Sequence, residues 1–81
     1  MTHYVYLLQS LSARSQRYVG ITTNLDARLA DHNAGKSSHT AKYPPWRIVT
    51  YIAFSDREKA ESFEIYLKSG SGHAFAKKRL W

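Results

Sequence analysis

The residues best suited to chemistry are two tyrosines, an arginine and a histidine in the first half of the chain. Arg28 and His32 are four residues apart, so a helix would place them on one face, partly buried and open to a cleft. Tyr6 and Tyr18 precede them, each within a stretch of β-forming residues. An acid–base group beside donors that hold anionic oxygens suits a reaction at a phosphodiester.

Each of these residues also has a simpler structural explanation. Tyrosines in strands usually pack, with their hydroxyl groups hydrogen-bonded. Arg28 could pair with a nearby aspartate at the surface, and His32 could be a hydrogen-bonded histidine at the edge of the core. Their combination favours a site, as does Gly20, because a glycine inside a strand often marks the close approach of another group.

Glu64 is the carboxylate best placed to hold a metal ion. It follows Phe63 on the border of an apolar helix face, where a carboxylate is costly unless it is paired, hydrated or bound to metal. An ion pair with Lys68, four residues on, is the alternative. Since the chain has only six acidic residues, any metal would be held by one carboxylate, water and substrate, which is typical of Mg²⁺.

Hydrophobic periodicity and turn residues predict the elements that must position these groups. The expected strands cover residues 3–8, 17–22 and 47–54, and the expected helices lie within residues 23–35, 55–70 and 71–80. The first two strands should form an antiparallel hairpin, and Gly35 and Gly70 should end the first two helices. The prediction is an α+β fold in the order β-β-α-β-α-α, with a three-stranded antiparallel sheet flanked by helices. At 81 residues we expect one domain, residues 1–81.

The net charge of +6 favours a polyanionic partner, most simply nucleic acid, over a basic protein with no specific partner. The loop at residues 35–46 would be either a phosphate-contacting surface or an ordinary surface loop. The lysines predicted to contact nucleic acid are Lys36, Lys42, Lys68, Lys77 and Lys78.

The absence of cysteine excludes disulfides and thiolate zinc sites. No apolar run approaches the roughly 18 residues of a membrane span, and the N-terminus lacks the pattern of a signal peptide. We therefore expect no membrane partner and a cytoplasmic location.

Four short motifs occur in order along almost the whole chain. They are Tyr4-Val5-Tyr6, Tyr18-Val19-Gly20, the segment from Leu25 through Arg28 to His32-Asn33, and Phe63-Glu64 followed by Leu67-Lys68. With these motifs the chain resembles the GIY-YIG nuclease superfamily, in its small single-domain branch of stand-alone, excinuclease-like proteins. It departs from the pattern in having Tyr4 in place of the first glycine, and in lacking the asparagine that some relatives carry after the glutamate.

The resemblance implies a hydrolytic DNA endonuclease that uses one Mg²⁺ or Mn²⁺ ion. Glu64 would ligate the ion, which would polarise the phosphate and assist departure of the 3′-oxygen. Tyr6 would activate the attacking water, directly or with His32, while Tyr18 and Arg28 would hold the scissile phosphate. The substrate would be branched, flapped or damaged DNA, in repair or recombination.

Two other functions remain open from the sequence. A non-catalytic nucleic-acid-binding module on the same fold would need the basic surface but not Glu64. A protein-interaction domain would bind with an affinity that is insensitive to salt, whereas phosphate binding falls steeply as salt rises.

Overall fold

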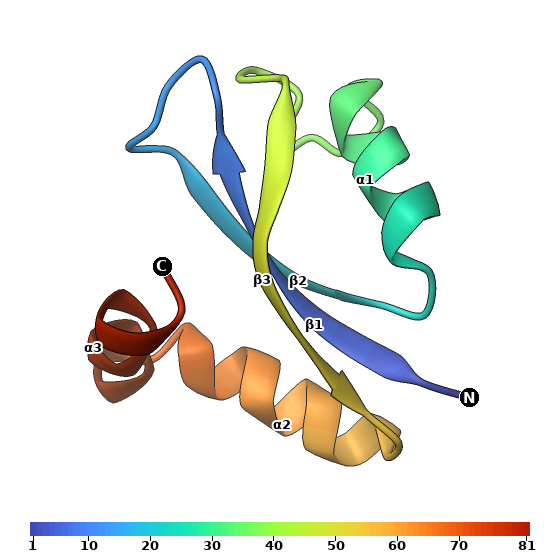
Figure 1. Cartoon of the computed structure of the whole chain (residues 1–81), viewed down its shortest axis with the longest axis vertical. Coiled ribbons are helices and arrows are strands. Elements are labelled where there is room, and N and C mark those ends of the chain that lie inside the picture. The colour runs from blue at the N-terminus through green and yellow to red at the C-terminus, as the bar shows by residue number, and fades with distance from the viewer.

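Three strands and three helices form the computed structural model, which describes residues 1–81 (Figure 1). The elements are β1 (His3–Ser10), β2 (Arg17–Thr22), α1 (Leu25–Asn33), β3 (Trp46–Phe54), α2 (Arg57–Leu67) and α3 (Gly70–Arg79). Both the predicted order and the predicted α+β class are confirmed. No helix has the length and apolar character needed to cross a membrane.

The sheet is antiparallel, with the strand order β2-β1-β3, so β1 is the central strand. β1 and β2 form the predicted hairpin, in which Tyr6 lies opposite Gly20. On β1, Val5, Tyr6, Leu7 and Leu8 are all buried. Because successive side chains point to opposite faces of a strand, this run shows that both faces of the sheet are covered.

Two small cores fill the spaces above and below the sheet. On one face, Leu25 and Leu29 of α1 pack against a cluster that includes Tyr6 and Leu8. On the other face, α2 and α3 cover Val5 and its neighbours, and Figure 1 shows these two helices opposite α1. Of the catalytic candidates on the α1 side of the sheet, Tyr6 on β1 is therefore buried, and Tyr18 on β2 is half-buried.

The helix ends differ in part from the prediction. Gly35 follows α1 with a φ of 76°, the left-handed conformation expected of a glycine that ends a helix. The prediction that Gly70 ends α2 is wrong, because Gly70 is the first residue of α3 and Ser69 caps that helix by accepting a hydrogen bond from the Gly72 amide at 3.2 Å. Gly72 is buried, and a methyl group there would collide with the carbonyl of Tyr66, so glycine lets α3 pack closely on the end of α2.

Candidate active site

The hydroxyl of Tyr6 joins the groups of the candidate site. Its oxygen lies 2.9 Å from Nε2 of His32, and the Nε–H of Arg28 donates to it at 3.4 Å. Arg28 and His32 reach the same oxygen because they lie one turn apart on the face of α1 that meets the sheet. The structure thus brings together three of the predicted residues around one hydroxyl group.

Gly20 makes this position of Tyr6 possible. The two residues are cross-strand partners, and the Tyr6 ring lies over the backbone of β2. A Cβ atom on residue 20 would collide with the Tyr6 hydroxyl oxygen and would lie 2.9 Å from the ring of Tyr18. The close approach suggested by a glycine in the strand is therefore made by two side chains of the site itself.

Thr40 fixes the imidazole of His32 from the side opposite Tyr6. Its hydroxyl lies 2.6 Å from His32 Nδ1, and its carbonyl accepts a hydrogen bond from the Trp46 indole at 2.8 Å. Because Arg28 donates to the Tyr6 oxygen, the Tyr6 proton is free to point at His32 Nε2. This favours the tautomer in which His32 Nδ1–H donates to Thr40 and Nε2 accepts from Tyr6.

Burial and charge keep both members of the Tyr6–His32 pair neutral at neutral pH. Burial raises the pKa of the Tyr6 hydroxyl, the hydrogen bond from Arg28 lowers it, and the negative charge of Glu64 raises it further. Burial and the neighbouring Arg28 charge lower the pKa of His32, and Asp31 partly opposes them. The hydrogen bond to Tyr6 raises the pKa of Arg28, so this side chain stays charged.

The site is layered by depth. Tyr6 is 2% exposed and His32 is completely buried, whereas the Arg28 side chain is 35% exposed and also approaches Asp31 at 3.9 Å. Tyr18 is half-buried, and its ring centre lies 5.0 Å from that of His32. Arg28 and Tyr18 can therefore touch a substrate, with Tyr6 and His32 beneath them.

Glu64 approaches the same region from α2. Its side chain is 17% exposed, and its Oε2 lies 2.5 Å from Nζ of Lys68, so the ion pair considered from the sequence is present. Lys68 Nζ in turn lies 6.0 Å from the centre of the Tyr18 ring. No three His, Asp or Glu side chains cluster as metal ligands. The donor chemistry fits a hard cation held by Glu64 alone, with water and substrate supplying its other ligands.

Comparison with known proteins identifies the family. A family model described as the GIY-YIG catalytic domain matches residues 2–78. The chain belongs to the GIY-YIG nuclease family. A UPF0213 protein of Lacticaseibacillus paracasei is 40% identical over 73 residues, covering 89% of this chain and 80% of that protein. The UPF0213 protein SH2523 of Staphylococcus haemolyticus is 37% identical over 70 residues, covering 85% of this chain and 83% of that protein.

A solved structure shares the fold. The solution NMR structure of the UPF0213 protein BH0048 from Bacillus halodurans matches with a TM-score of 0.57 and 32% identity, covering 96% of this chain and 84% of that chain. This likeness supports a small GIY-YIG protein with the same arrangement of strands and helices.

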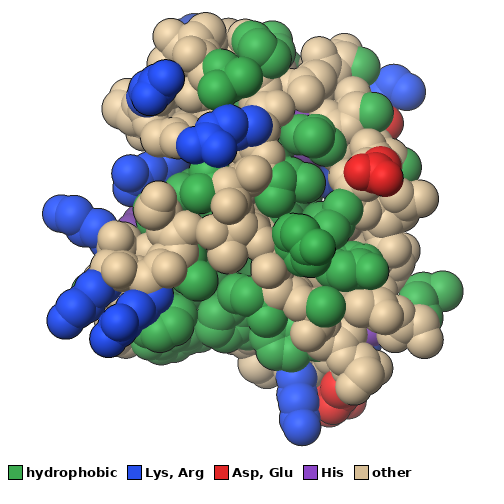
Figure 2. Space-filling model, in the orientation of Figure 1, with side chains coloured by type: hydrophobic (Ala, Val, Ile, Leu, Met, Phe, Trp, Pro, Cys, Tyr) green, Lys and Arg blue, Asp and Glu red, His purple; other side chains and the backbone are tan.

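The predicted DNA-contacting lysines of this GIY-YIG chain lie in different surroundings. Lys68 and Lys77 line one cavity, Lys36 approaches Asp31 at 3.7 Å, and Lys42 lies over the Tyr43 ring. Lys78 is exposed on α3. Figure 2 shows several basic side chains on the side of the molecule that carries α3, with few acidic ones in view.

Two expectations about the GIY-YIG site need correction. His32 is not partly open to a cleft, because it is fully buried between Tyr6 and Thr40 and can act only through another residue. The loop at residues 35–46 is not wholly a surface, because Thr40 and Ser37 point inward. Sequence reasoning missed Thr40 as the residue that positions His32, since nothing in the loop pattern distinguishes it from its exposed neighbours.

Proposed function

We propose that this chain is a divalent-metal-dependent DNA endonuclease that hydrolyses phosphodiester bonds in cytoplasmic DNA repair or recombination. Membership of the GIY-YIG nuclease family supports a nuclease. The observation that carries the finer proposal is the Tyr6 oxygen, held between a neutral His32 and a charged Arg28. In that arrangement the Tyr6 hydroxyl can donate its proton, and His32 Nε2 can accept it.

Tyr6 and His32 would act together as the general base. As a water molecule attacks phosphorus, its proton passes to the Tyr6 oxygen while the Tyr6 proton passes to His32 Nε2. The lowered pKa of His32 leaves its ring unprotonated and ready to accept. Thr40 holds the ring in the accepting orientation, and Arg28 stabilises negative charge that develops on the Tyr6 oxygen.

The exposed members of the site would bind the substrate. The remaining donors of Arg28 can hold two phosphate oxygens, since a guanidinium forms parallel hydrogen bonds with such groups. The Tyr18 hydroxyl would add a further donor. As the bond from phosphorus to the 3′-oxygen breaks, these groups would stabilise the charge that accumulates on the phosphate.

Glu64 would hold the metal ion. When bound, Mg²⁺ or Mn²⁺ would polarise the phosphate and assist departure of the 3′-oxygen. The ion would compete with Lys68 for the Glu64 carboxylate, because the ammonium group already lies against Oε2. Lys68 released from this pair would be close enough to Tyr18 to meet the phosphate backbone.

The Glu64–Lys68 pair is also the observation that favours the alternative, a non-catalytic nucleic-acid-binding module. A carboxylate that is already paired with a lysine one helical turn away does not need a metal ion to balance its charge. The two functions make opposite predictions about Glu64, because only the nuclease requires it.

The deciding experiment is cleavage of branched, flapped, nicked and plain duplex DNA in Mg²⁺ or Mn²⁺ by wild type, Glu64→Ala and Glu61→Ala. Glu61 is a matched control, since it lies on the same helix and its only ion pair, with Arg57 at 3.7 Å, is at the surface. We expect wild type and Glu61→Ala to cut, and cutting to disappear in Glu64→Ala and in chelator.

The other outcomes separate the alternatives. Cutting that survives Glu64→Ala would contradict the assignment of Glu64. If no substrate is cut while salt-sensitive DNA binding is retained, and Glu64→Ala binds as tightly as wild type or more tightly, the chain is a binding module. An affinity that does not change with salt concentration would instead indicate a protein-interaction domain, because binding to phosphates weakens steeply as salt rises.

A further inference from the structure

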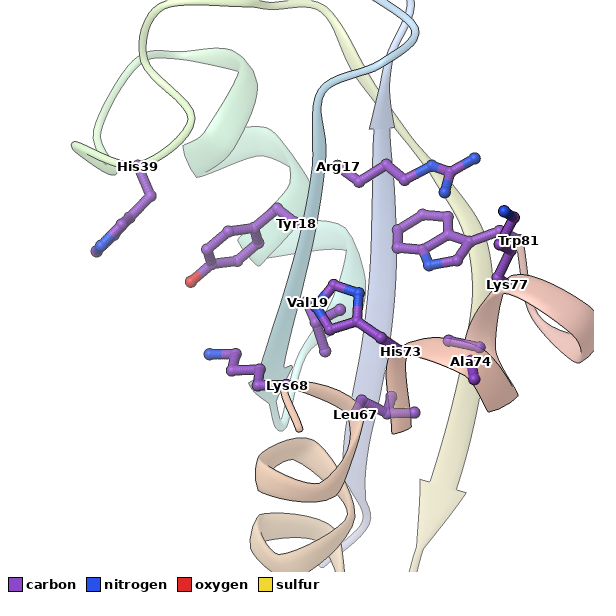
Figure 3. Close-up of a pocket in the computed structure, with 11 residues that line it drawn as sticks. Arg17, Tyr18, Val19, His39, Leu67, Lys68, His73, Ala74, Lys77 and Trp81 are labelled. Carbon is purple, nitrogen blue, oxygen red and sulfur yellow. The ribbon is translucent and has the colours of Figure 1, made fainter. Parts of the chain in front are cut away.

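A cavity of about 480 Å³ opens beside the candidate active site, between β2, the end of α2 and the C-terminal segment (Figure 3). We call it the α3 pocket; its walls include Tyr18, Val19, Lys68, Ala74, Lys77 and Trp81. A volume of this size lies in the range of about 300–1,000 Å³ that is typical of sites for small organic ligands.

The inner surface of the α3 pocket is apolar and partly aromatic. Tyr18 lies on one side of strand β2, and Trp81 lies on the other side, next to Ala74 and Lys77 of α3 (Figure 3). The guanidinium of Arg17 lies 4.8 Å from the centre of the Trp81 ring. The small side chain of Ala74 leaves space beside the Trp81 ring, so a flat ring could enter on this side of β2.

The rim of the pocket is basic. Arg17, Lys68 and Lys77 are among its eleven lining residues, and none of the eleven is acidic. Aromatic surfaces that stack bases, next to cations that follow the phosphates, are the two components of sites for unpaired nucleic acid. The pocket therefore matches a nucleotide better than it matches an uncharged apolar ligand.

The pocket and the candidate active site share two residues. Tyr18 lines the pocket while its ring lies 5.0 Å from that of His32, and Lys68 lines it while pairing with Glu64. A nucleotide in the pocket would consequently lie next to the phosphate that Arg28 and Tyr18 are proposed to hold.

We propose that the α3 pocket binds an unpaired nucleotide of the strand to be cut, next to the scissile phosphate. Its link to cleavage rests on the proposed function. A base within a duplex would have to leave its stack to enter, whereas a base in a flap or overhang is already free. The pocket would thus make DNA with unpaired nucleotides the preferred substrate over plain duplex.

The test is binding in chelator, where no DNA is cut. The DNA probes are a blunt duplex, the same duplex with a short single-stranded overhang, and that overhang with abasic residues, which keep the phosphates and lack the bases. We expect wild type to bind the base-bearing overhang roughly tenfold more tightly than the abasic one. Binding of the base should also quench the fluorescence of Trp81, since the chain's other tryptophan, Trp46, is buried.

Ala74→Leu should reduce this difference to about twofold or less by filling the pocket. Ala74 is exposed, so the added bulk removes nothing from the core, and an unchanged melting temperature would establish that the variant folds. Lys77→Ala should weaken both overhang complexes. Lys59→Ala, which removes one charge from an exposed position outside the pocket, should preserve the tenfold difference.

Equal affinity of wild type for the two overhangs would overturn the proposal, as would a tenfold difference that persists in Ala74→Leu, or no binding of any probe. These results are independent of cleavage. A base-dependent affinity in a protein that never cuts DNA would sustain the pocket and remove the nuclease, and cleavage without base-dependent affinity would do the reverse.

Discussion

Tyr6 and His32 form a buried pair in which each side chain controls the proton of the other. Arg28 and Thr40 orient this pair from its two ends, at 3.4 Å from the Tyr6 oxygen and 2.6 Å from His32 Nδ1. Tyr6 and His32 are not unusual residues in themselves. Their behaviour follows from exclusion of water, which favours the neutral form of both groups.

The pH dependence of His32 gives the first prediction. Because its pKa is lowered on folding, the unfolded chain binds a proton more readily than the folded chain below about pH 6.5. The free energy of unfolding should therefore decrease as the pH falls from about 6.5 towards the pKa of His32 in the folded chain. Above about pH 6.5, the titration of His32 should leave the free energy of unfolding unchanged. Cleavage should fall over the acid range for the same reason, since a protonated His32 cannot accept from Tyr6.

Histidine-ring NMR measures this pKa directly, and the difference in unfolding free energy between wild type and His32→Asn across the pH range isolates it from other ionisable groups. A pKa of His32 above 6.5, or an identical pH slope in the two proteins, would contradict the proposed neutral acceptor.

Gly20→Ala is predicted to disable the site without touching any reacting group. The new methyl group would displace the Tyr6 hydroxyl, which occupies the space that a Cβ would need, away from His32 and Arg28. Loss of a positioned general base lowers rates by about 10²- to 10⁴-fold. Cleavage kinetics would measure this loss.

The matched comparison is with Tyr6→Phe. If both substitutions act on the same hydroxyl, the double variant should be no slower than the slower single variant. If the rate loss of the double variant is instead the product of the two single losses, Gly20 acts by a route other than the Tyr6 hydroxyl.

At the scale of elements, the junction between α2 and α3 depends on contact between backbones. Gly72 leaves no room for a side chain, since a Cβ there would overlap the Tyr66 carbonyl oxygen, whereas a Cβ on Gly70 would meet nothing within 4 Å. The two glycines are two residues apart in one helix, but only Gly72 lies where a side chain cannot fit.

We predict that Gly72→Ala lowers the free energy of unfolding by about 3 kcal/mol, because an overfilled site must shift backbone. Gly70→Ala should instead be neutral or stabilising by up to about 1 kcal/mol, since it restricts the unfolded chain at no steric cost. Thermal or urea unfolding of the two variants provides the measurement. Equal destabilisation of both would mean that α3 does not approach α2 as closely as the structure shows.

For the molecule as a whole, the sequence predicted the order of all six elements because their signals are local. The β-forming residues of β1 and β2 and the apolar positions of α1 and α2 can be read within a few residues. The end of α2 was predicted wrongly at Gly70. The boundary between α2 and α3 depends on the close packing of Gly72 against Tyr66, which a local sequence pattern does not reveal.

The site divides in the same way. Tyr6, Tyr18, Arg28 and His32 could be predicted as a group because consecutive elements carry them. The depth of His32 and the part played by Thr40 could not, because the loop after α1 has no periodic pattern and takes its shape from contacts such as that with Trp46. The α3 pocket was equally unpredictable, since it joins β2 to residues some fifty positions later.

Under the proposed nuclease function, the wide separation of the site residues along the chain has a consequence during protein synthesis. During synthesis, Tyr6, Tyr18, Arg28 and His32 leave the ribosome first, but α1 is anchored by Asn33 to the backbone of Trp46, in a strand that comes later. Glu64 emerges later still, on α2, the helix that follows that strand. An unfinished chain would therefore contain the residues proposed to bind a phosphate, but neither the strand that anchors α1 nor the glutamate proposed to hold the metal ion. We expect a nascent chain or an early proteolytic fragment to leave DNA uncut.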